Sequence, residues 1–175
     1  MKNHKIVLVL AFMATTVFLA NANQTHLVPG YEIENSDVSD VLDAYLGIKN
    51  SLVKDDAKKA AEFGTALANA TKSFDSKSSS SSEVNEILEV IKEHGEHIAK
   101  SDIGHQREHF AELTNEVKDL VKITGSDRTL YTQYCPMYNS NKGGFWLSTS
   151  KEIRNPLFGS KMLKCGSVKE TIEKN

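Results

Sequence analysis

Apolar residues recur at intervals of three and four positions in four stretches of the chain between residues 37 and 125. This spacing is typical of amphipathic helices that bury one face. Residues suited to helix capping precede the first stretch at Ser36–Asp37 and the fourth at Ser101–Asp102, and Gly125 follows the fourth. The apolar positions are Val38, Val41, Leu42, Tyr45 and Leu52; Ala60, Phe63, Leu67, Ala70 and Phe74; Val84, Ile87, Leu88, Ile91 and Ile98; and Ile103, Phe110, Leu113, Val117 and Leu120.

The four predicted helices fall into two pairs, and a serine-rich segment at residues 77–83, KSSSSSE, separates the pairs. A serine run buries no apolar surface, so this segment is predicted to be a flexible linker. Amphipathic helices cannot bury their apolar faces alone and must pack on one another. Residues 37–125 are therefore predicted to form an antiparallel four-helix bundle.

After Gly125 the pattern changes to a period of two. Residues 130–135 alternate as a strand does, NSNKGG at 139–144 has turn composition, and 145–147 is a second short β-like run. Thr149–Glu152 resembles a capping box and predicts a brief turn of helix, which Asn155–Pro156 would end. The predicted fold is thus mainly α: a four-helix bundle and a C-terminal tail, residues 126–175 of the same domain, that contains a short β-hairpin and packs on the bundle.

The N-terminus has the features of an export signal. Lys2 and Lys5 precede an uncharged apolar run, Ile6–Leu19, and the small residues at 20–22 suit cleavage after Ala22. That run is short for a membrane span, and nothing downstream is long and apolar enough to be one. Residues 1–22 are therefore predicted to be a signal peptide that is removed, and residues 23–36 an extended or disordered lead. The mature protein is expected to be soluble and periplasmic, without a membrane span.

Charge and motifs argue against several functional classes. The formal net charge is -2, and the loss of two lysines with the signal peptide makes it -4. A mildly acidic chain without a basic stripe argues against nucleic acid as a partner. The sequence has no glycine-rich phosphate loop and no G-x-S-x-G, H-E-x-x-H or C-x-x-C motif. We therefore expect that the protein is not an enzyme.

The tail contains both cysteines and two of the four methionines, arranged as two sulfur pairs. Cys135 and Met137 are two residues apart, which places them on one face of a strand. Met162 and Cys165 are three apart, which places them on one face of a helical turn. Thiolate and thioether ligands together select Cu(I). A disulfide is the alternative, because two cysteines in an oxidising compartment commonly pair, and methionine also fills cores. Spacing alone leaves these alternatives open.

The histidines form a second group of candidate ligands. His94 and His97 are three residues apart and His105 and His109 are four apart, each pair on one predicted helix. Such spacings allow chelation, although the polar neighbours also fit a solvated helix face. His94 lies nearest the apolar stripe, and His109, beside Phe110, becomes a metal candidate if the tail folds back onto this helix. His109 and His94 are therefore secondary candidates for metal binding.

The segment CPMYNSNKGGFWLSTSKEIRNPLFGSKMLKCGSV, residues 135–168, contains in order C-P-M, a glycine-containing loop, W-L-S, E-I-x-N-P, F-G and M-L-x-C-G. With this pattern the chain from Tyr131 to about Thr171 resembles a family of exported bacterial domains of unknown function. LDAYLGIKNSLVKDDA at 42–57 and HIAKSDIGHQREHFAEL at 97–113 resemble the same family more loosely. Tyr138, Gly144 and Leu157 depart from the residues usual in the family, and no departure removes a sulfur.

Similar domains also occur fused to periplasmic adaptor subunits of copper/silver efflux systems, so the resemblance implies heavy-metal handling. The implied ligands of Cu(I) or Ag(I) are Cys135, Met137, Met162 and Cys165. The expected function is metal buffering or delivery to efflux, with an efflux adaptor or another envelope protein as partner. The alternative expectation is a metal-free periplasmic interaction domain with a structural Cys135–Cys165 disulfide.

Overall fold

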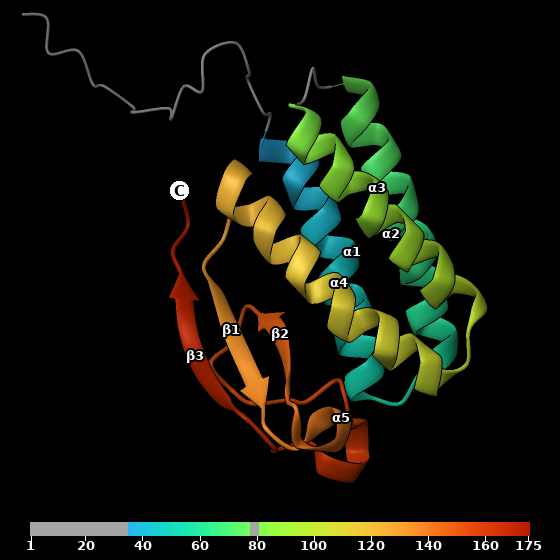
Figure 1. Ribbon diagram of the computed structural model, residues 1–175, viewed down its shortest axis with the longest axis vertical. Helices are drawn as coiled ribbons and strands as arrows, with labels where there is room; N and C mark the ends of the chain where they lie inside the picture. The colour runs from blue at the N-terminus through green and yellow to red at the C-terminus, as the bar shows by residue number, and fades with distance from the viewer. Residues whose placement is uncertain (1–34, 78–80) are drawn as a thin grey trace, which may run out of the picture.

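The computed structural model describes residues 35–77 and 81–175 (Figure 1). The predicted signal peptide, residues 1–22, lies outside the described residues, as do residues 23–34 of the predicted lead and residues 78–80 of the serine segment. Within the described part of the chain, no helix combines the length and the apolar character that crossing a bilayer requires.

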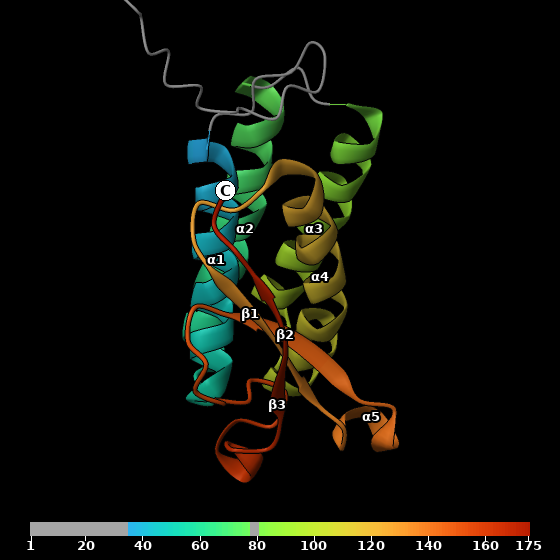
Figure 2. The ribbon, with the colours of Figure 1, turned by 90° about the vertical axis from the view of Figure 1, so that its left-hand side faces the viewer.

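Four long helices form a bundle, and a small antiparallel sheet lies against one side of it (Figures 1 and 2). α1 packs on α2, α2 on α3 and α3 on α4, and α4 also contacts α1. The prediction of a mainly α fold with packed helices and a β-containing tail is confirmed. The helices are α1 (Asn35–Val53), α2 (Ala57–Lys77), α3 (Ser82–Lys100) and α4 (Ile103–Thr124).

Several helix ends lie inside segments for which no helix was expected. The side chain of Ser81 accepts a hydrogen bond from the backbone N–H of Val84 (3.3 Å), so this serine caps α3 and the helix begins at Ser82. α2 extends to Lys77 at the other end of the serine segment, and α1 begins at Asn35. Serine is favourable before a helix because its hydroxyl satisfies a backbone N–H of the first turn. The serine-rich composition suggested a linker and did not predict that Ser81 would cap a helix.

The backbones of α2 and α3 are in close contact at Gly64 and Gly95. A Cβ added at Gly64 would lie 2.7 Å from the carbonyl oxygen of Gly95, and one added at Gly95 would lie 2.9 Å from the carbonyl oxygen of Gly64. Both contacts are shorter than packed carbon and oxygen atoms tolerate, so the helices reach this separation only with glycine at both positions. Because His94 precedes Gly95, the contact also fixes the part of α3 that carries the histidines.

The tail forms three strands in the order β2-β1-β3, and the sheet faces α1 and α4 (Figure 2). β1 and β2 are the predicted hairpin, and their antiparallel register pairs Gln133 with Trp146. β3 pairs antiparallel with the other edge of β1 and was not predicted. The elements of the tail are β1 (Leu130–Cys135), α5 (Tyr138–Asn141), β2 (Gly144–Ser148), the 3-10 turn η1 (Gly159–Met162) and β3 (Ser167–Ile172).

The predicted turn of helix at Thr149–Glu152 is absent. The Ser148 hydroxyl accepts a hydrogen bond from the backbone N–H of Ser150, and the Ser150 hydroxyl accepts one from the N–H of Glu152, each at 3.1 Å. The side-chain amide of Gln133 donates to the carbonyl oxygens of Ser150 (2.8 Å) and Glu152 (3.2 Å). The serines and Gln133 thus occupy the backbone groups that a helix would have used.

Tyr45 of α1 is fully buried, and its hydroxyl links the sheet to the bundle by hydrogen bonds. Its hydroxyl lies 2.8 Å from Thr114 Oγ1 and accepts a hydrogen bond from the backbone N–H of Leu147 (2.9 Å). Thr114 Oγ1 donates to the carbonyl oxygen of Phe110 (3.0 Å), so the hydroxyl of Tyr45 is the donor to Thr114. β2 is an edge strand, and this contact satisfies one of its outward N–H groups inside the protein.

Candidate metal centre in the C-terminal tail

Cys135 is the last residue of the central strand, β1, and its side chain is fully buried. It pairs with Gly144 of β2, while the preceding residue, Tyr134, pairs with Ser167 of β3. The cysteine also belongs to the same apolar core as Trp146, which is itself fully buried. Strand pairing on both edges of β1 therefore fixes the backbone around Cys135.

Cys165 lies on the segment between η1 and β3, and the fully buried Asn155 holds this segment in place. The side-chain amide of Asn155 donates to the carbonyl oxygen of Cys165 (2.9 Å). The backbone N–H of Asn155 donates to the carbonyl oxygen of Leu163 (2.9 Å). Its Oδ1 accepts hydrogen bonds from the backbone N–H groups of Leu157 (2.8 Å) and Phe158 (3.3 Å). A single side chain therefore closes the loop from residue 155 to residue 165.

Cys135 and Cys165 are neighbours in the fold, and both are free thiols in the structure. Burial raises the pKa of the Cys165 thiol, and the neighbouring Cys135 raises it further. The backbone N–H of Met137 acts in the opposite direction, because a hydrogen bond donated to the sulfur stabilises the thiolate. The two cysteines are therefore neighbours, but β1 ends at Cys135 and Met137 has helical backbone angles, so the prediction that Cys135 and Met137 share one face of a strand is wrong.

The two methionines flank Cys165 through their backbones. Met137 directs its N–H at the sulfur of Cys165, and the carbonyl oxygen of Met162 accepts a hydrogen bond from the N–H of Cys165 (3.0 Å). Met137 is 51% exposed and Met162 is half-buried. The backbones of both methionines therefore lie beside Cys165, and both cysteines are more deeply buried than Met137.

An ion pair attaches the sulfur-bearing loop to the bundle. Arg107 of α4 pairs with Asp55, in the connection between α1 and α2, and donates to the carbonyl oxygens of Leu52 (3.1 Å) and Pro156 (3.0 Å). Asp55 Oδ2 accepts a hydrogen bond from the backbone N–H of Ser160 (3.1 Å). Hydrogen bonds from Ser160 and Arg107 lower the pKa of Asp55, so this carboxylate stays charged well into the acidic range. The position of the loop therefore depends on contacts made by the helices.

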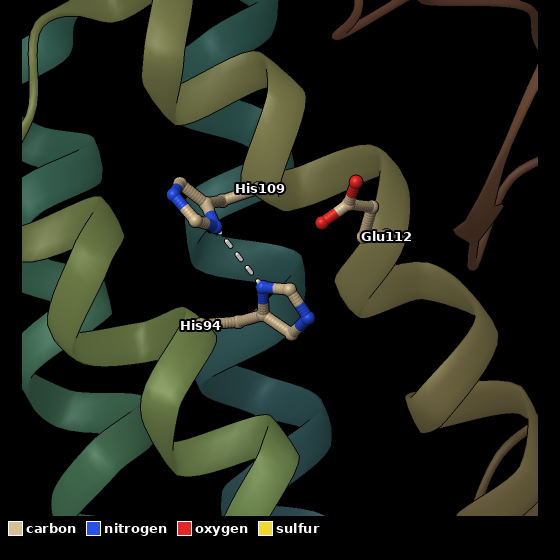
Figure 3. A group of neighbouring side chains, drawn as sticks. All are labelled: His94, His109 and Glu112. Atoms are coloured by element: carbon tan, nitrogen blue, oxygen red, sulfur yellow. Dashed lines mark hydrogen bonds between the residues drawn. The ribbon is translucent and has the colours of Figure 1, made fainter.

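The histidines of α3 and α4 form one cluster, which includes the predicted pair His105 and His109 on α4 and also joins the two helices. His94 Nδ1 lies 3.1 Å from His109 Nδ1 (Figure 3), and His109 Nε2 lies 3.1 Å from His105 Nε2. The ring of His97 stacks on that of His109, with centroids 4.5 Å apart. Burial is the main cause that lowers the pKa of both His94 and His109, so both rings are neutral at pH 7, the form that binds metals.

One member of this cluster was not identified from the sequence. The carboxylate of Glu112 has an oxygen within 4.8 Å of a ring nitrogen of both His94 and His109, and Figure 3 shows it directed toward the two rings. Glu112 follows His109 by three residues, so both lie on the same face of α4. The three-residue spacing of His109 and Glu112 could have suggested a ligand pair from the sequence. Their partner on α3, His94, becomes apparent only when the two helices are packed together.

The fold is a helical bundle that carries a small antiparallel sheet. A model of the family described as protein of unknown function (DUF3347) matches residues 41–129. The chain belongs to this family. The match covers most of the bundle, including residues 42–57 and 97–113, and ends immediately before β1, so both cysteines lie outside it. Neither a curated protein nor a solved structure matches the chain.

Proposed function

We propose that the protein binds a soft monovalent metal ion, Cu(I) or Ag(I), at the Cys135–Cys165 thiol pair. The observation that carries the proposal is that Cys135, on the central strand, lies close enough to Cys165, on a distant loop, to raise the pKa of its thiol. Strand pairing at Cys135 and the hydrogen bond from Asn155 to Cys165 hold both cysteine segments in place, so little further ordering of the chain opposes binding. The donor set also fits the metal, because soft thiolate and thioether ligands favour Cu(I) over hard divalent ions.

Binding requires the thiols to lose their protons, because the thiolate is the ligand. Burial and the neighbouring Cys135 raise the pKa of the Cys165 thiol further above neutral pH, so the metal displaces a proton when it binds. The thioethers of Met137 and Met162 carry no proton and add no charge. Met137 is exposed and adjacent to the thiols, so it is suited to capture an incoming ion and to release it again without unfolding of the tail.

The proposed setting is the periplasm, where the protein would buffer the metal or pass it to an efflux adaptor. This part of the proposal rests on the N-terminal sequence, which resembles an export signal, and on the resemblance of the tail to domains fused to copper/silver efflux adaptors. The half-exposed side of the sulfur cluster supports transfer by direct contact, since a partner's sulfur ligands would reach the ion from that side.

Competition for Cu(I) with a coloured chelator, under anaerobic and reducing conditions, tests this function. We expect that the Cys135→Ser, Cys165→Ser double variant binds Cu(I) about 100-fold more weakly than the wild type, equivalent to about 2.8 kcal/mol. Replacing either methionine by leucine keeps the volume and should weaken binding less, because both thiolates remain. Equal affinity of the wild type and the double cysteine variant would rule the proposal out.

Two controls accompany the competition measurement. Circular dichroism and thermal unfolding establish that the serine variants remain folded. The His94→Gln, His109→Gln double variant removes two further metal ligands and leaves the thiols intact, so it should retain the wild-type affinity for Cu(I). A loss of Cu(I) binding in this histidine variant would place the metal elsewhere.

The same proximity of the two cysteines also supports the second candidate, a metal-free interaction domain in which Cys135 and Cys165 form a structural disulfide. Intact mass before and after alkylation, on protein taken from the periplasm, separates the two candidates. Two alkylated thiols in the native protein favour the metal site. A closed bridge that resists mild reductant favours the interaction domain, because oxidised cysteines do not bind Cu(I).

A further inference from the structure

We propose that His94, His109 and Glu112 form a second metal site, independent of the thiol pair, which takes a divalent transition cation such as Zn(II). The ligands are Nδ1 of each imidazole and one carboxylate oxygen. Two imidazoles and a carboxylate suit borderline cations, which bind nitrogen and oxygen, rather than Cu(I). Such a set leaves the fourth tetrahedral position to water or to a ligand from outside.

The distances in the cluster fit a small tetrahedral ion. A Zn–N bond of about 2.0–2.1 Å and a tetrahedral angle place two nitrogen ligands about 3.3 Å apart. His94 Nδ1 and His109 Nδ1 already lie 3.1 Å apart, on separate helices (Figure 3). The ligand atoms of the three residues lie within 4.8 Å of one another, so only the exposed side chain of Glu112 must move inward.

A chain of hydrogen bonds behind His109 sets the tautomer that this site needs. With Nδ1 on the metal, Nε2 of His109 carries the proton and donates to Nε2 of His105, 3.1 Å away. His105 then carries its own proton on Nδ1, which donates to the Glu108 carboxylate at 2.9 Å. Metal-bound histidines in proteins commonly donate their second N–H to such a partner, which orients the ring and raises its basicity. His105 is thus a positioning residue.

The charges around the cluster favour a cation. Glu112, Glu116 and Glu93 act electrostatically on His94 and favour positive charge at its ring, against the opposing effects of burial and of His97. The supporting helices are also fixed, because Gly95 next to His94 lies in backbone contact with α2, and Phe110 next to His109 is fully buried. The two rings therefore face each other across a rigid helix pair.

Zn(II) titration of the full chain carrying Cys135→Ser and Cys165→Ser tests the site without competition from the thiols. Competition with a coloured zinc chelator gives the affinity. We expect one Zn(II) per chain, about 100-fold weaker binding after His94→Gln or His109→Gln, and about tenfold weaker binding after His105→Gln. The matched control is His97→Gln, which removes a ring stacked on His109 but no ligand atom and should change the affinity less than about threefold.

Nitrogen NMR of the histidine rings provides a readout that needs no variant at the site. Zn(II) should shift the Nδ1 resonances of His94 and His109 and leave Nε2 of His109 protonated. The absence of Zn(II) binding, or binding that survives both His94→Gln and Glu112→Gln, would overturn the proposal. Because the cysteines are already replaced, these outcomes are independent of whether the thiol pair binds Cu(I).

Discussion

At the scale of single residues, Lys49 is the clearest example of a side chain whose environment alters its chemistry. It lies on α1 beneath the sheet, is only 6% exposed, and donates hydrogen bonds to Asn50 Oδ1 (3.1 Å) and Ser148 Oγ (3.5 Å). Burial, and secondarily the charge of Arg154, lowers the pKa of Lys49 from its usual 10.5 to about 8, against the opposing effect of Glu152. Protonation of Lys49 is therefore less favourable in the folded protein than in the unfolded chain.

This environment predicts a stability difference that depends on pH. Between pH 8 and 10.5 the unfolded chain holds the Lys49 proton more tightly than the folded protein does, so stability of the wild type rises with pH across that interval. Below pH 8 both states are protonated and the full cost of the buried charge is present. We expect Lys49→Met to be more stable than the wild type at pH 7, and this difference to shrink by roughly 3 kcal/mol at pH 10.5.

Urea unfolding of the two proteins at pH 7 and pH 10.5 measures this change. Other groups that titrate in the range contribute equally to both proteins, so they cancel in the comparison. If the difference in unfolding free energy between the variant and the wild type stays constant with pH, the pKa of Lys49 is not lowered in the folded protein, and the account is contradicted.

Residue spacing in the sequence predicted part of the candidate sites, but it did not predict the contacts between helices. The positions of Cys135 and Cys165 in two short motifs suggested a common site, and the two cysteines are neighbours in the fold, since Cys135 raises the pKa of the Cys165 thiol. For the histidines, spacing indicated pairs within each helix, and His105 and His109 do lie 3.1 Å apart on α4. It did not indicate the equally short distance between His94 and His109, which joins α3 to α4. Contacts of that kind depend on the register of α3 against α4, which no spacing within one helix contains.

At the scale of elements, the sheet and the bundle are joined through β2. Its edge is adjacent to α1 and α4, and Tyr45 connects all three elements through its hydroxyl. Burial strongly raises the pKa of Tyr45, so the hydroxyl keeps its proton and remains available as a donor to Thr114. The tail is thus connected to the helices by a buried polar contact as well as by apolar packing.

Tyr45→Phe should lower the free energy of unfolding by about 1–3 kcal/mol, because the backbone N–H of Leu147 is left buried without an acceptor. Denaturant unfolding measures the loss. Tyr131→Phe, at a half-buried position of the sheet, is the matched control and should have an effect below about 0.5 kcal/mol. Equal effects of the two substitutions would indicate that the Tyr45 hydroxyl does not hold the sheet.

The elements that sequence patterns predicted are those with a buried face. Each long helix has an apolar stripe, and the hairpin strands β1 and β2 alternate or carry large apolar residues. β3, with the sequence SVKETI, is mostly exposed and lacks any such pattern. It forms because it completes the second edge of β1 through backbone hydrogen bonds. Backbone pairing leaves little trace in side-chain polarity, so this strand was missed.

At the scale of the whole molecule, the two proposed sites use different parts of the fold. The thiol pair joins the central strand to a loop that is fastened to the bundle by Arg107 and Asp55. The histidine site lies between α3 and α4, within the segment that matches the family model. A soft sulfur site and a borderline nitrogen and oxygen site would thus allow one small protein to distinguish two classes of metal ion.

X-ray absorption at the copper edge, on the reduced wild-type chain loaded with one equivalent of Cu(I), tests the central claim most directly because it identifies the ligand atoms. We predict sulfur neighbours alone in the first shell, and their loss in the Cys135→Ser, Cys165→Ser variant. A first shell of nitrogen or oxygen, or a sulfur shell that the double variant retains, would contradict metal binding by the thiol pair.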